Sequence, residues 1–256
     1  MVLTDTHTHL YYHNEGLEGQ LNRAISGGVK RLFMPNIDSA TIAPMLDISR
    51  QYPNNCFPML GLHPASVNNN YRAELEKIKS AFTPLNKICG VGEIGLDYFH
   101  SKEFVNEQKE AFIEQISWAK QYNLPIVIHL RNAYKDFIDI VRKYFPNPIN
   151  AVVHCFSGDV SQAEELVSLG FFLGIGGILT YKNSTLRDVL QYVPIENIVI
   201  ETDAPFLAPV PFRGKQNESS YILYTAAQLA KVYNVTMSDI ALTTTAEFKA
   251  LFFKIT

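Results

Sequence analysis

The sequence predicts a single (β/α)8 TIM-like barrel over residues 1–256. Short apolar, β-branched runs alternate with amphipathic segments of helical period, as a parallel sheet with crossover helices requires. Eight such runs occur, and the chain has 256 residues, close to the roughly 250 that one barrel uses. No linker, repeat or low-complexity stretch divides the chain. An open, doubly wound parallel sheet is the alternative architecture.

The expected elements follow one another in strict alternation. In chain order, the strands are expected at residues 2–5, 30–35, 57–62, 88–92, 126–129, 151–154, 171–174 and 198–201. The helices between them are expected at residues 17–26, 41–51, 73–81, 103–122, 134–144, 161–169 and 183–192, and two more at 220–233 and 238–252 close the chain.

Local signals mark where several elements begin and end. Ser161 and Glu164 have the spacing of a capping box, and Gly170 is placed to end the same helix. The stretch 204–214, rich in proline and glycine, follows the last expected strand. We interpret it as a long active-site loop, because a structureless loop of that length within a barrel is usually functional.

Composition limits the classes of function. The net charge is −3, so the chain has no overall attraction to polyanions, and a nucleic-acid substrate needs a local basic patch. The three cysteines, Cys56, Cys89 and Cys155, form neither a disulfide framework nor a CxxC metal motif. The first residues lack the pattern of a signal peptide, and no apolar run is long enough to span a membrane. We expect a cytoplasmic protein without an obligatory protein partner.

Histidines and carboxylates stand at the carboxyl ends of the expected strands. His7 and His9 form an HxH pair whose side chains share one face, because side chains in a strand alternate. Barrel enzymes place catalytic groups at this end of their strands. The polar residues that end the other strands are His63, Glu93, His129, His154 and Asp203.

This set of side chains suits one or two divalent ions such as Zn²⁺ or Mn²⁺. Glu93 can bridge two ions because a carboxylate has two oxygens. Asp203 can bind an ion and also accept a proton from metal-bound water, whose pKa the ion lowers to roughly 7. We therefore expect Asp203 and Glu93 to be the catalytic carboxylates, and Asp5 and Glu201 to orient imidazoles as carboxylates outside the ligand shell.

The residues and motifs together resemble the TatD family of metal-dependent deoxyribonucleases, within the amidohydrolase-like superfamily. The resemblance runs almost from end to end of the chain. It includes DTHTHL at 5–10, GLHP at 61–64, GEIGLDY at 92–98, residues 108–115 and 125–131, HCFSG at 154–158, ETDAP at 201–205 and RGKQNE at 213–218.

The resemblance implies a TIM-like barrel with two divalent metal ions, either Mg²⁺ or a transition metal such as Mn²⁺ or Zn²⁺. It implies that His7, His9, Glu93 and Asp203 hold one ion, and that Glu93, His129 and His154 hold the other. The implied reaction is hydrolysis of phosphodiester bonds in DNA, often from an end, and we expect single strands or ends as the substrate.

Three positions depart from the family pattern. Thr8 stands where the family often has cysteine, and Ser219 follows Glu218 where the family has proline. Near the C-terminus, Glu247 precedes Phe248 where the family has asparagine before an aromatic residue. None of these changes removes an expected metal ligand.

Four further residues are candidates for binding substrate: His63, Arg131, Arg213 and Lys215. Arg131 lies two residues past His129 and therefore on the same face, where its guanidinium can clamp a phosphate. Arg213 and Lys215 supply local positive charge, although an ordinary loop salt bridge is an equal alternative for Lys215. His13 and His100 are expected to be ordinary loop histidines.

Aromatic residues gather in the loops expected at the barrel mouth: Tyr11, Tyr12, Tyr98 and Phe99. They are suited to stacking on unpaired bases, and simple packing is the competing explanation.

Two other functions stay open. A small-molecule amidohydrolase, lactonase or phosphoesterase can use the same barrel, although many such enzymes carry a lysine that bridges two metals, and Glu93 takes that position here. An inactive metal-binding protein is the third hypothesis, and the complete ligand set argues against it.

Overall fold

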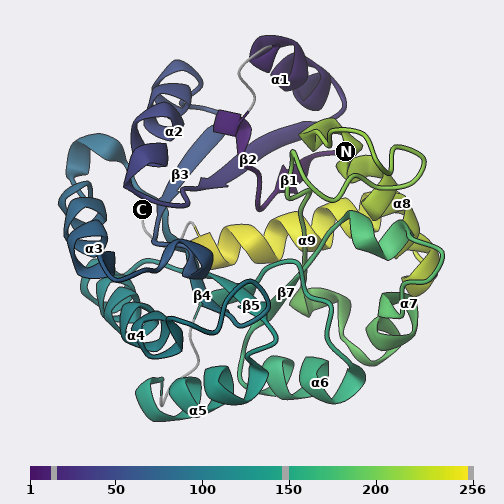
Figure 1. Cartoon of the computed structure of the whole chain (residues 1–256). Coiled ribbons are helices and arrows are strands. Elements are labelled where there is room, and N and C mark those ends of the chain that lie inside the picture. Colours follow the sequence, from purple (N-terminus) through teal and green to yellow (C-terminus); the bar gives the residue numbers. More distant parts are fainter. Residues whose placement is uncertain (13–15, 146–149, 253–256) are drawn as a thin grey trace.

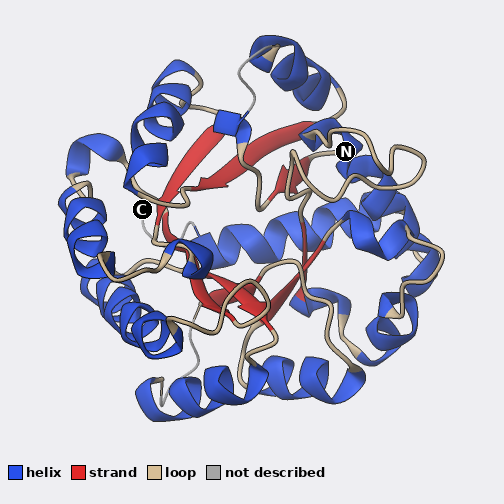
Figure 2. Ribbon diagram, viewed as in Figure 1, coloured by secondary structure: helices blue, strands red, loops and turns tan. Residues whose placement is uncertain are grey.

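The computed structural model describes residues 1–12, 16–145 and 150–252, except for the side chains of 247 and 249–251. His13 and the side chain of Glu247 therefore lie outside the described part. Eight parallel strands follow one another in a single sheet in the order β1 to β8 (Figure 2). They are β1 Leu3–Asp5, β2 Val29–Pro35, β3 Cys56–Leu60, β4 Gly90–Asp97, β5 Ile126–Arg131, β6 Ala151–Val153, β7 Phe172–Ile175 and β8 Ile198–Ile200.

Helices surround the strands, as Figure 1 shows. In chain order they are α1 Leu17–Ser26, α2 Ser39–Gln51, α3 Tyr71–Ser80, α4 Val105–Tyr122, α5 Tyr134–Tyr144, α6 Val160–Ser168, α7 Leu186–Val189, α8 Ile222–Tyr233 and α9 Met237–Phe252. Each strand therefore presents its carboxyl end on the same side of the barrel. This arrangement confirms the (β/α)8 barrel and shows that the doubly wound alternative was wrong.

The barrel closes between β1 and β8 through the loops that follow these two strands. The Thr6 amide donates to the Ile200 carbonyl at 3.1 Å, and the Asp203 amide donates to the His7 carbonyl at 2.9 Å. The buried Asp5 carboxylate accepts from both the amide and the hydroxyl of Thr202, at 2.9 and 2.6 Å. We call these contacts the β1–β8 seam. They join the segments that carry His7 and Asp203.

Helix α9 crosses the barrel (Figure 1) and closes the end that lies opposite the carboxyl ends of the strands. Two of its aromatic side chains, Phe248 and Phe252, pack in a buried cluster with inward-facing strand residues. The strand residues of this cluster are Phe33, Met59, Val127, Val152 and Val199. His129 lies two residues after Val127 and therefore on the same inward face of β5. The packing of α9 against this face thus forms the bottom of the barrel interior that holds the polar cluster.

Strand β4 contains an irregularity that the sequence did not reveal. Its register against β5 gains one residue between Val91 and Ile94, the mark of a β-bulge. Glycines allow the two strands to approach there: a Cβ on Gly95, whose φ is +145°, would lie 2.0 Å from the His129 carbonyl oxygen. The strand ends at Asp97 and not at Gly92 as expected, so Glu93 lies within it.

Two other local expectations were wrong. Helix α6 is capped by Asp159 with Gln162 as its capping-box partner, and Ser161 is already inside the helix. The segment expected as one helix at 183–192 forms only the short α7, followed by a 3-10 turn over Leu190–Tyr192. The other expected elements exist within a few residues of their expected bounds.

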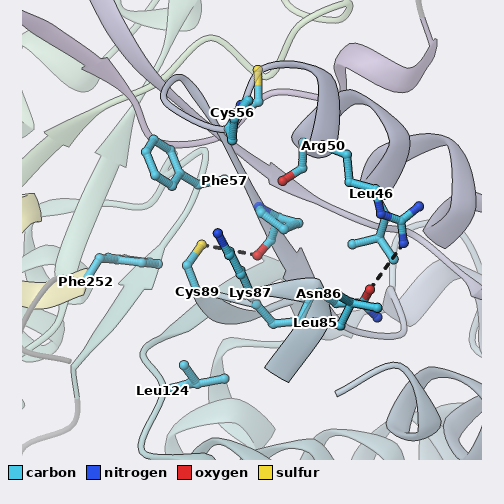
Figure 3. A pocket seen from close by; sticks show the side chains of 14 residues that line it. Leu46, Arg50, Cys56, Phe57, Leu85, Asn86, Lys87, Cys89, Leu124 and Phe252 are labelled. Carbon is cyan, nitrogen blue, oxygen red and sulfur yellow. Dashed lines mark hydrogen bonds between the residues drawn. The ribbon is translucent and has the colours of Figure 1, made fainter. Parts of the chain in front are cut away.

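A cavity of about 840 Å³ opens at the amino ends of β3 and β4, remote from the polar cluster. Figure 3 shows its wall, in which Cys56, Cys89 and Phe252 lie around an apolar space bordered by Arg50 and Lys87. All three cysteines are free thiols, in agreement with the sequence. Among the described residues, no helix is both long and apolar enough to cross a membrane.

Candidate active site

The expected polar residues meet at the carboxyl ends of the strands. His7 and His9 follow β1, Glu93 lies in β4, His129 lies in β5 and His154 follows β6. Asp203 follows β8, and His63 follows β3. The side chains of His7, His9, Glu93 and His154 are at most 5% exposed. Such a cluster of buried polar groups is costly unless each member has a partner or a shared ion.

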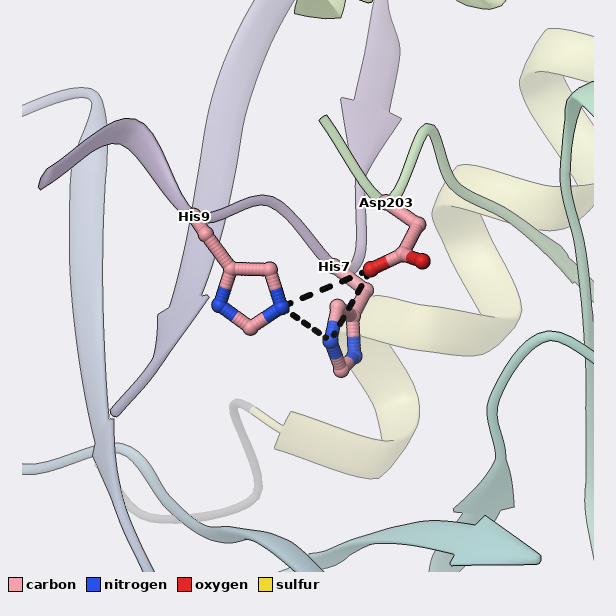
Figure 4. A group of neighbouring side chains, drawn as sticks. All are labelled: His7, His9 and Asp203. Carbon is pink, nitrogen blue, oxygen red and sulfur yellow. Dashed lines mark hydrogen bonds and ion pairs between the residues drawn. The ribbon is translucent and has the colours of Figure 1, made fainter. Parts of the chain in front are cut away.

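The first group of ligand atoms surrounds one Glu93 oxygen. His7 Nε2 lies 3.2 Å from both His9 Nε2 and Glu93 Oε2. Asp203 Oδ1 lies 3.4 Å from His9 Nε2 and 3.7 Å from His7 Nε2. Figure 4 shows His7 and His9, from the segment after β1, pointing toward Asp203 from the loop after β8.

The second group surrounds the other Glu93 oxygen. Glu93 Oε1 lies 2.6 Å from His154 Nε2 and 2.7 Å from His129 Nδ1. His63 Nε2 is also near, at 3.3 Å from the same oxygen and 3.2 Å from His129 Nδ1. The two oxygens of Glu93 therefore face two different sets of nitrogen atoms.

The donors present fit a divalent ion. Imidazole nitrogens and carboxylate oxygens bind Zn²⁺ at about 2.0–2.2 Å, which places tetrahedral ligand atoms about 3.4 Å apart. The separations of 3.2 to 3.7 Å within the first group match that spacing. The second group has two shorter separations, 2.6 and 2.7 Å, which are hydrogen-bond lengths.

Hydrogen bonds on the far nitrogen of each ring decide which nitrogen is free to bind a metal. Tyr11 donates its hydroxyl hydrogen to the Pro35 carbonyl at 2.6 Å, so its oxygen accepts from His9 Nδ1 at 2.7 Å. His9 Nε2 is then the unprotonated atom that faces the cluster. The carboxylate of Asp97 likewise accepts from His129 Nε2 at 2.8 Å, so Nδ1 is the atom that a neutral His129 ring would offer to a metal ion.

His63 has the opposite arrangement. Its Nδ1 accepts a hydrogen bond from the backbone amide of Ala65 at 3.1 Å. The neutral ring therefore carries its hydrogen on Nε2, the atom that points at Glu93. In this tautomer His63 presents an N–H to Glu93, although its Nε2 also belongs, with atoms of Glu93 and His129, to a group close enough to share a metal ion.

Both acidic residues of the cluster are held ionised. Burial alone would raise the pKa of Glu93, but His154, His63 and His7 hold that pKa well below its usual range. Burial opposes ionisation of Asp203 too, yet its contacts with His9, His7 and His154 keep its pKa below the ordinary value. Both carboxylates are therefore available as anionic ligands near neutral pH.

Glu201 lies where the sequence analysis placed it, behind an imidazole. Its Oε1 accepts from the Cys155 amide at 2.6 Å and lies 3.6 Å from His154 Nδ1. Asp5 does not behave as expected, because it binds Thr202 and the backbone of His7 and contacts no imidazole. Asp5 maintains the β1–β8 seam.

The sequence analysis missed Asp97, named Tyr11 only as an aromatic residue that could stack on bases, and treated His100 as an ordinary loop histidine. Asp97 Oδ2 accepts from His129 Nε2 and also lies 2.7 Å from His100 Nδ1, so His100 is part of the site's surroundings. Tyr11 is buried and fixes His9. The signal for Asp97 was its place four residues after Glu93, on the same face of a continuing strand.

The expected basic residues lie around the mouth and outside the cluster. Arg131 is exposed, and its guanidinium lies 3.7 Å from the Phe99 ring centroid. Arg213 is also exposed and lies 4.6 Å from the centroid of Tyr181. Lys215 is exposed on the same loop as Arg213.

The aromatic residues of the mouth divide into packed and exposed ones. Tyr98 is held by Asp136 through a 2.8 Å hydrogen bond. Tyr12 and Phe99 are 42% and 58% exposed. Phe206, which the sequence did not single out, is 51% exposed with its ring centroid 6.1 Å from both Tyr12 and His9.

Two of the unusual positions contact each other. The Ser219 hydroxyl donates to the Thr8 hydroxyl at 3.3 Å, and both residues are buried beside the seam. The two departures from the family pattern therefore form one polar contact, which leaves the ligand side of the seam unchanged.

A (β/α)8 barrel with a buried histidine and carboxylate cluster at its strand ends defines a metal-dependent hydrolase. The family model described as TatD related DNase matches residues 4–253. The "Uncharacterized metal-dependent hydrolase YabD" of Bacillus subtilis (strain 168) is 36% identical over 98% of this chain and 99% of its own length. The corresponding hydrolase YcfH of Escherichia coli (strain K12) is 33% identical over 98% and 96%.

The fold is shared with a solved structure of the same kind. The crystal structure of YjjV, a TatD homologue from Escherichia coli K12, superimposes with a TM-score of 0.91 at 30% identity, over 98% of each chain. The chain belongs to the TatD family of metal-dependent hydrolases.

Proposed function

We propose that this hydrolase cleaves phosphodiester bonds of DNA and uses two divalent ions to do so. The observation that carries the proposal is the position of Glu93, whose two oxygens face two separate groups of nitrogen ligands. Two ions roughly 4 Å apart suit an in-line displacement at phosphorus, because they steady the attacking and the leaving oxygen.

The proposed ligand sets are those that the family resemblance implies, and the observed separations support them. His7, His9, Asp203 and Glu93 Oε2 would hold one ion, and Glu93 Oε1, His129 and His154 would hold the other. The ligands accept Mg²⁺, Mn²⁺ or Zn²⁺, with the nitrogen-rich donor set favouring the transition metals.

The chain's own side chains supply proton handling and orientation. Two divalent ions held there would neutralise charge on the phosphoryl oxygens and make water acidic enough to attack at neutral pH. Asp203, ionised and 15% exposed, accepts the proton of the attacking water. His63 donates a hydrogen bond from Nε2 to a phosphate oxygen, and Arg213 and Lys215 add positive charge around the mouth.

The proposed substrate form is single-stranded DNA or an unpaired end. Tyr12, Phe99 and Phe206 expose large aromatic surfaces beside the cluster. Stacking of a base on such a ring is worth about 1–3 kcal/mol, and it requires a base that is not paired within a duplex.

The test is cleavage of end-labelled single-stranded DNA by metal-stripped protein after Mg²⁺, Mn²⁺ or Zn²⁺ is restored separately. Asp203→Asn should lower turnover by at least 100-fold while its circular dichroism spectrum matches the wild type. Asp47→Asn is the matched control, because Asp47 is 63% exposed on α2 and its loss should leave activity unchanged.

Near-full activity of Asp203→Asn would remove Asp203 from its proposed role. Absence of DNA cleavage by the wild type, with two bound ions confirmed by calorimetric titration, would overturn the nuclease proposal. A small ester, lactone or amide would then be the substrate to seek on the same site.

A further inference from the structure

A polar cavity lies at the carboxyl ends of β5 and β6, the strands at whose ends His129 and His154 lie. It measures about 360 Å³, within the range of small-ligand sites. The loops after β5 and β6 form it, and these loops directly follow His129 and His154. Its polar lining comes from Arg131, Asn132, Tyr134, Ser157, Gly158 and Gln162. We call it the Arg131 pocket.

The cation of this pocket has no acidic partner. Across residues 1–12, 16–145 and 150–252, no carboxylate oxygen lies within 4.0 Å of the Arg131 guanidinium, and none of the lining residues is acidic. Other exposed arginines, such as Arg72 and Arg142, pair with carboxylates, whereas Arg213 lies over the Tyr181 ring as Arg131 lies over Phe99. The pocket therefore combines a net positive charge with neutral hydrogen-bonding groups.

A ring contact holds Arg131 in place and leaves the N–H groups of its guanidinium available for a ligand. Its guanidinium lies over the Phe99 ring, with 3.7 Å between the central carbon and the ring centroid. Stacking of this kind orients the flat group and leaves its N–H groups free, in the fork that matches two phosphate oxygens. The Ser157 hydroxyl, on the facing loop, offers a further donor.

The floor of the pocket requires glycine at position 158. A Cβ there would lie 2.3 Å from Gln162 Oε1 and 2.9 Å from the Phe156 ring. Gln162 in turn accepts from the Asp159 amide as the capping-box partner of α6. The pocket is thus part of the folded framework of the two loops.

We propose that the Arg131 pocket binds the phosphate next to the one that is cleaved. The ligand class is an oligonucleotide with at least two phosphate groups, because one phosphate occupies the ligand cluster and the second reaches Arg131. This inference rests on the proposed function, and it names which substrates the site prefers among phosphodiesters.

The first measurement is kcat/KM on substrates that differ in phosphate number. The dinucleotide dTpdT has one phosphate, and dTpdTpdT has two. We expect the wild type to gain tenfold or more on the longer substrate and Arg131→Ala to lose that gain. On dTpdT the two proteins should agree within twofold. Ser157→Asp, which places an anion in the pocket, should reproduce the loss.

The matched control is Arg50→Ala, which removes an exposed arginine at the opposite end of the barrel. It should keep the full preference for two phosphates. An equal loss on both substrates in Arg131→Ala, or no loss on either, would overturn the proposal.

A binding measurement separates this proposal from the nuclease proposal. In the Asp203→Asn background with Mn²⁺ bound, the affinity for fluorescent dT6 is measured against salt concentration. Removal of one phosphate contact lowers the slope of log K against log[salt] by about 0.7 for a single strand. If Arg131→Ala reduces the slope but the wild type does not cleave DNA, the Arg131 pocket binds phosphate and the nuclease proposal is wrong. If the wild type cleaves DNA but Arg131→Ala leaves the slope unchanged, the nuclease proposal stands and the pocket proposal is wrong.

Discussion

The histidines of the cluster differ in the atom they present, and their neighbours decide it. Tyr11 and Asp97 take the outer hydrogen of His9 and His129, whereas a backbone amide takes the outer lone pair of His63. A row of similar side chains thus divides into proposed metal ligands and a proposed hydrogen-bond donor. The division depends on residues of no obvious chemical role in the sequence.

Asp97→Asn tests this dependence. The change removes the negative charge that fixes the tautomer of His129, and loss of such a partner typically weakens metal binding 10- to 100-fold. We expect calorimetric titration with Mn²⁺ to show this weakening at one ion only, since His129 belongs to one group. Equal weakening of both ions, or of neither, would contradict the assignment.

The sequence predicted the ligand residues better than their surroundings. His7, His9, His129 and His154 stand at ends of apolar runs, and that position alone indicates a shared site. The roles of Asp97 and Tyr11 were missed because they depend on where a strand stops and which way a loop turns. Arg131 was expected on the same strand face as His129. The stacking of its guanidinium on the Phe99 ring could not be predicted, because it depends on how the loop that carries Phe99 folds.

At the scale of elements, β4 shows why boundaries are hard to read from sequence. The strand was expected to stop at Gly92, whereas the observed β4 continues to Asp97. In the structure Gly92 and Gly95 instead let β4 approach β5, with a bulge between Val91 and Ile94. The bulge depends on how β4 pairs with β5, so it cannot be predicted from the sequence of β4 alone.

An ion pair between helices offers a test at the same scale. Asp136 on α5 lies 2.6 Å from Lys109 Nζ on α4 and accepts from Tyr98 at 2.8 Å. The Lys109 and Tyr98 contacts lower the pKa of Asp136. Its side chain is 30% exposed, so we expect Asp136→Asn to cost only about 0.5–1 kcal/mol at pH 7.

The pH dependence of that loss has a definite sign. A carboxylate with a depressed folded pKa stabilises the fold above its unfolded pKa near 3.9 and loses this effect as pH falls through the folded value. Urea unfolding should therefore separate wild type and variant at pH 7 and bring them together toward pH 3. Asp139→Asn on the same helix, 61% exposed, is the control and should stay within about 0.3 kcal/mol. A gap that widens in acid would contradict this account.

At the scale of the whole molecule, the two groups of ligand atoms connect five of the eight strands. They draw on β1, β4, β5, β6 and β8, on both sides of the β1–β8 seam. Ions bound there would add cross-links to the β1–β8 seam, where a few backbone hydrogen bonds and a single bridge between Thr8 and Ala204 join the two segments. The barrel was predictable from the alternation of strand and helix patterns along the sequence. The β1–β8 seam was not, because it depends on a hydrogen bond between Thr202 and Asp5, which are far apart in the sequence.

Metal removal should therefore lower the melting temperature. An ion at 100 times its dissociation constant adds about 2.7 kcal/mol of stability. For a chain of this size that amount corresponds to a shift of roughly 5–10 °C. Scanning calorimetry with chelator, and again after Mn²⁺ or Zn²⁺ is restored, measures it. Asp203→Asn should show a smaller shift, and an unchanged melting temperature in the wild type would contradict metal-linked stability.

The seam also makes the candidate site sensitive to truncation of the chain. Thr202, beside Asp203, lies 197 residues after its partner Asp5. A chain that stops before Thr202 has three of the four residues of the first group, namely His7, His9 and Glu93, and lacks Asp203. We therefore expect truncated or partly synthesised chains to lack the complete site.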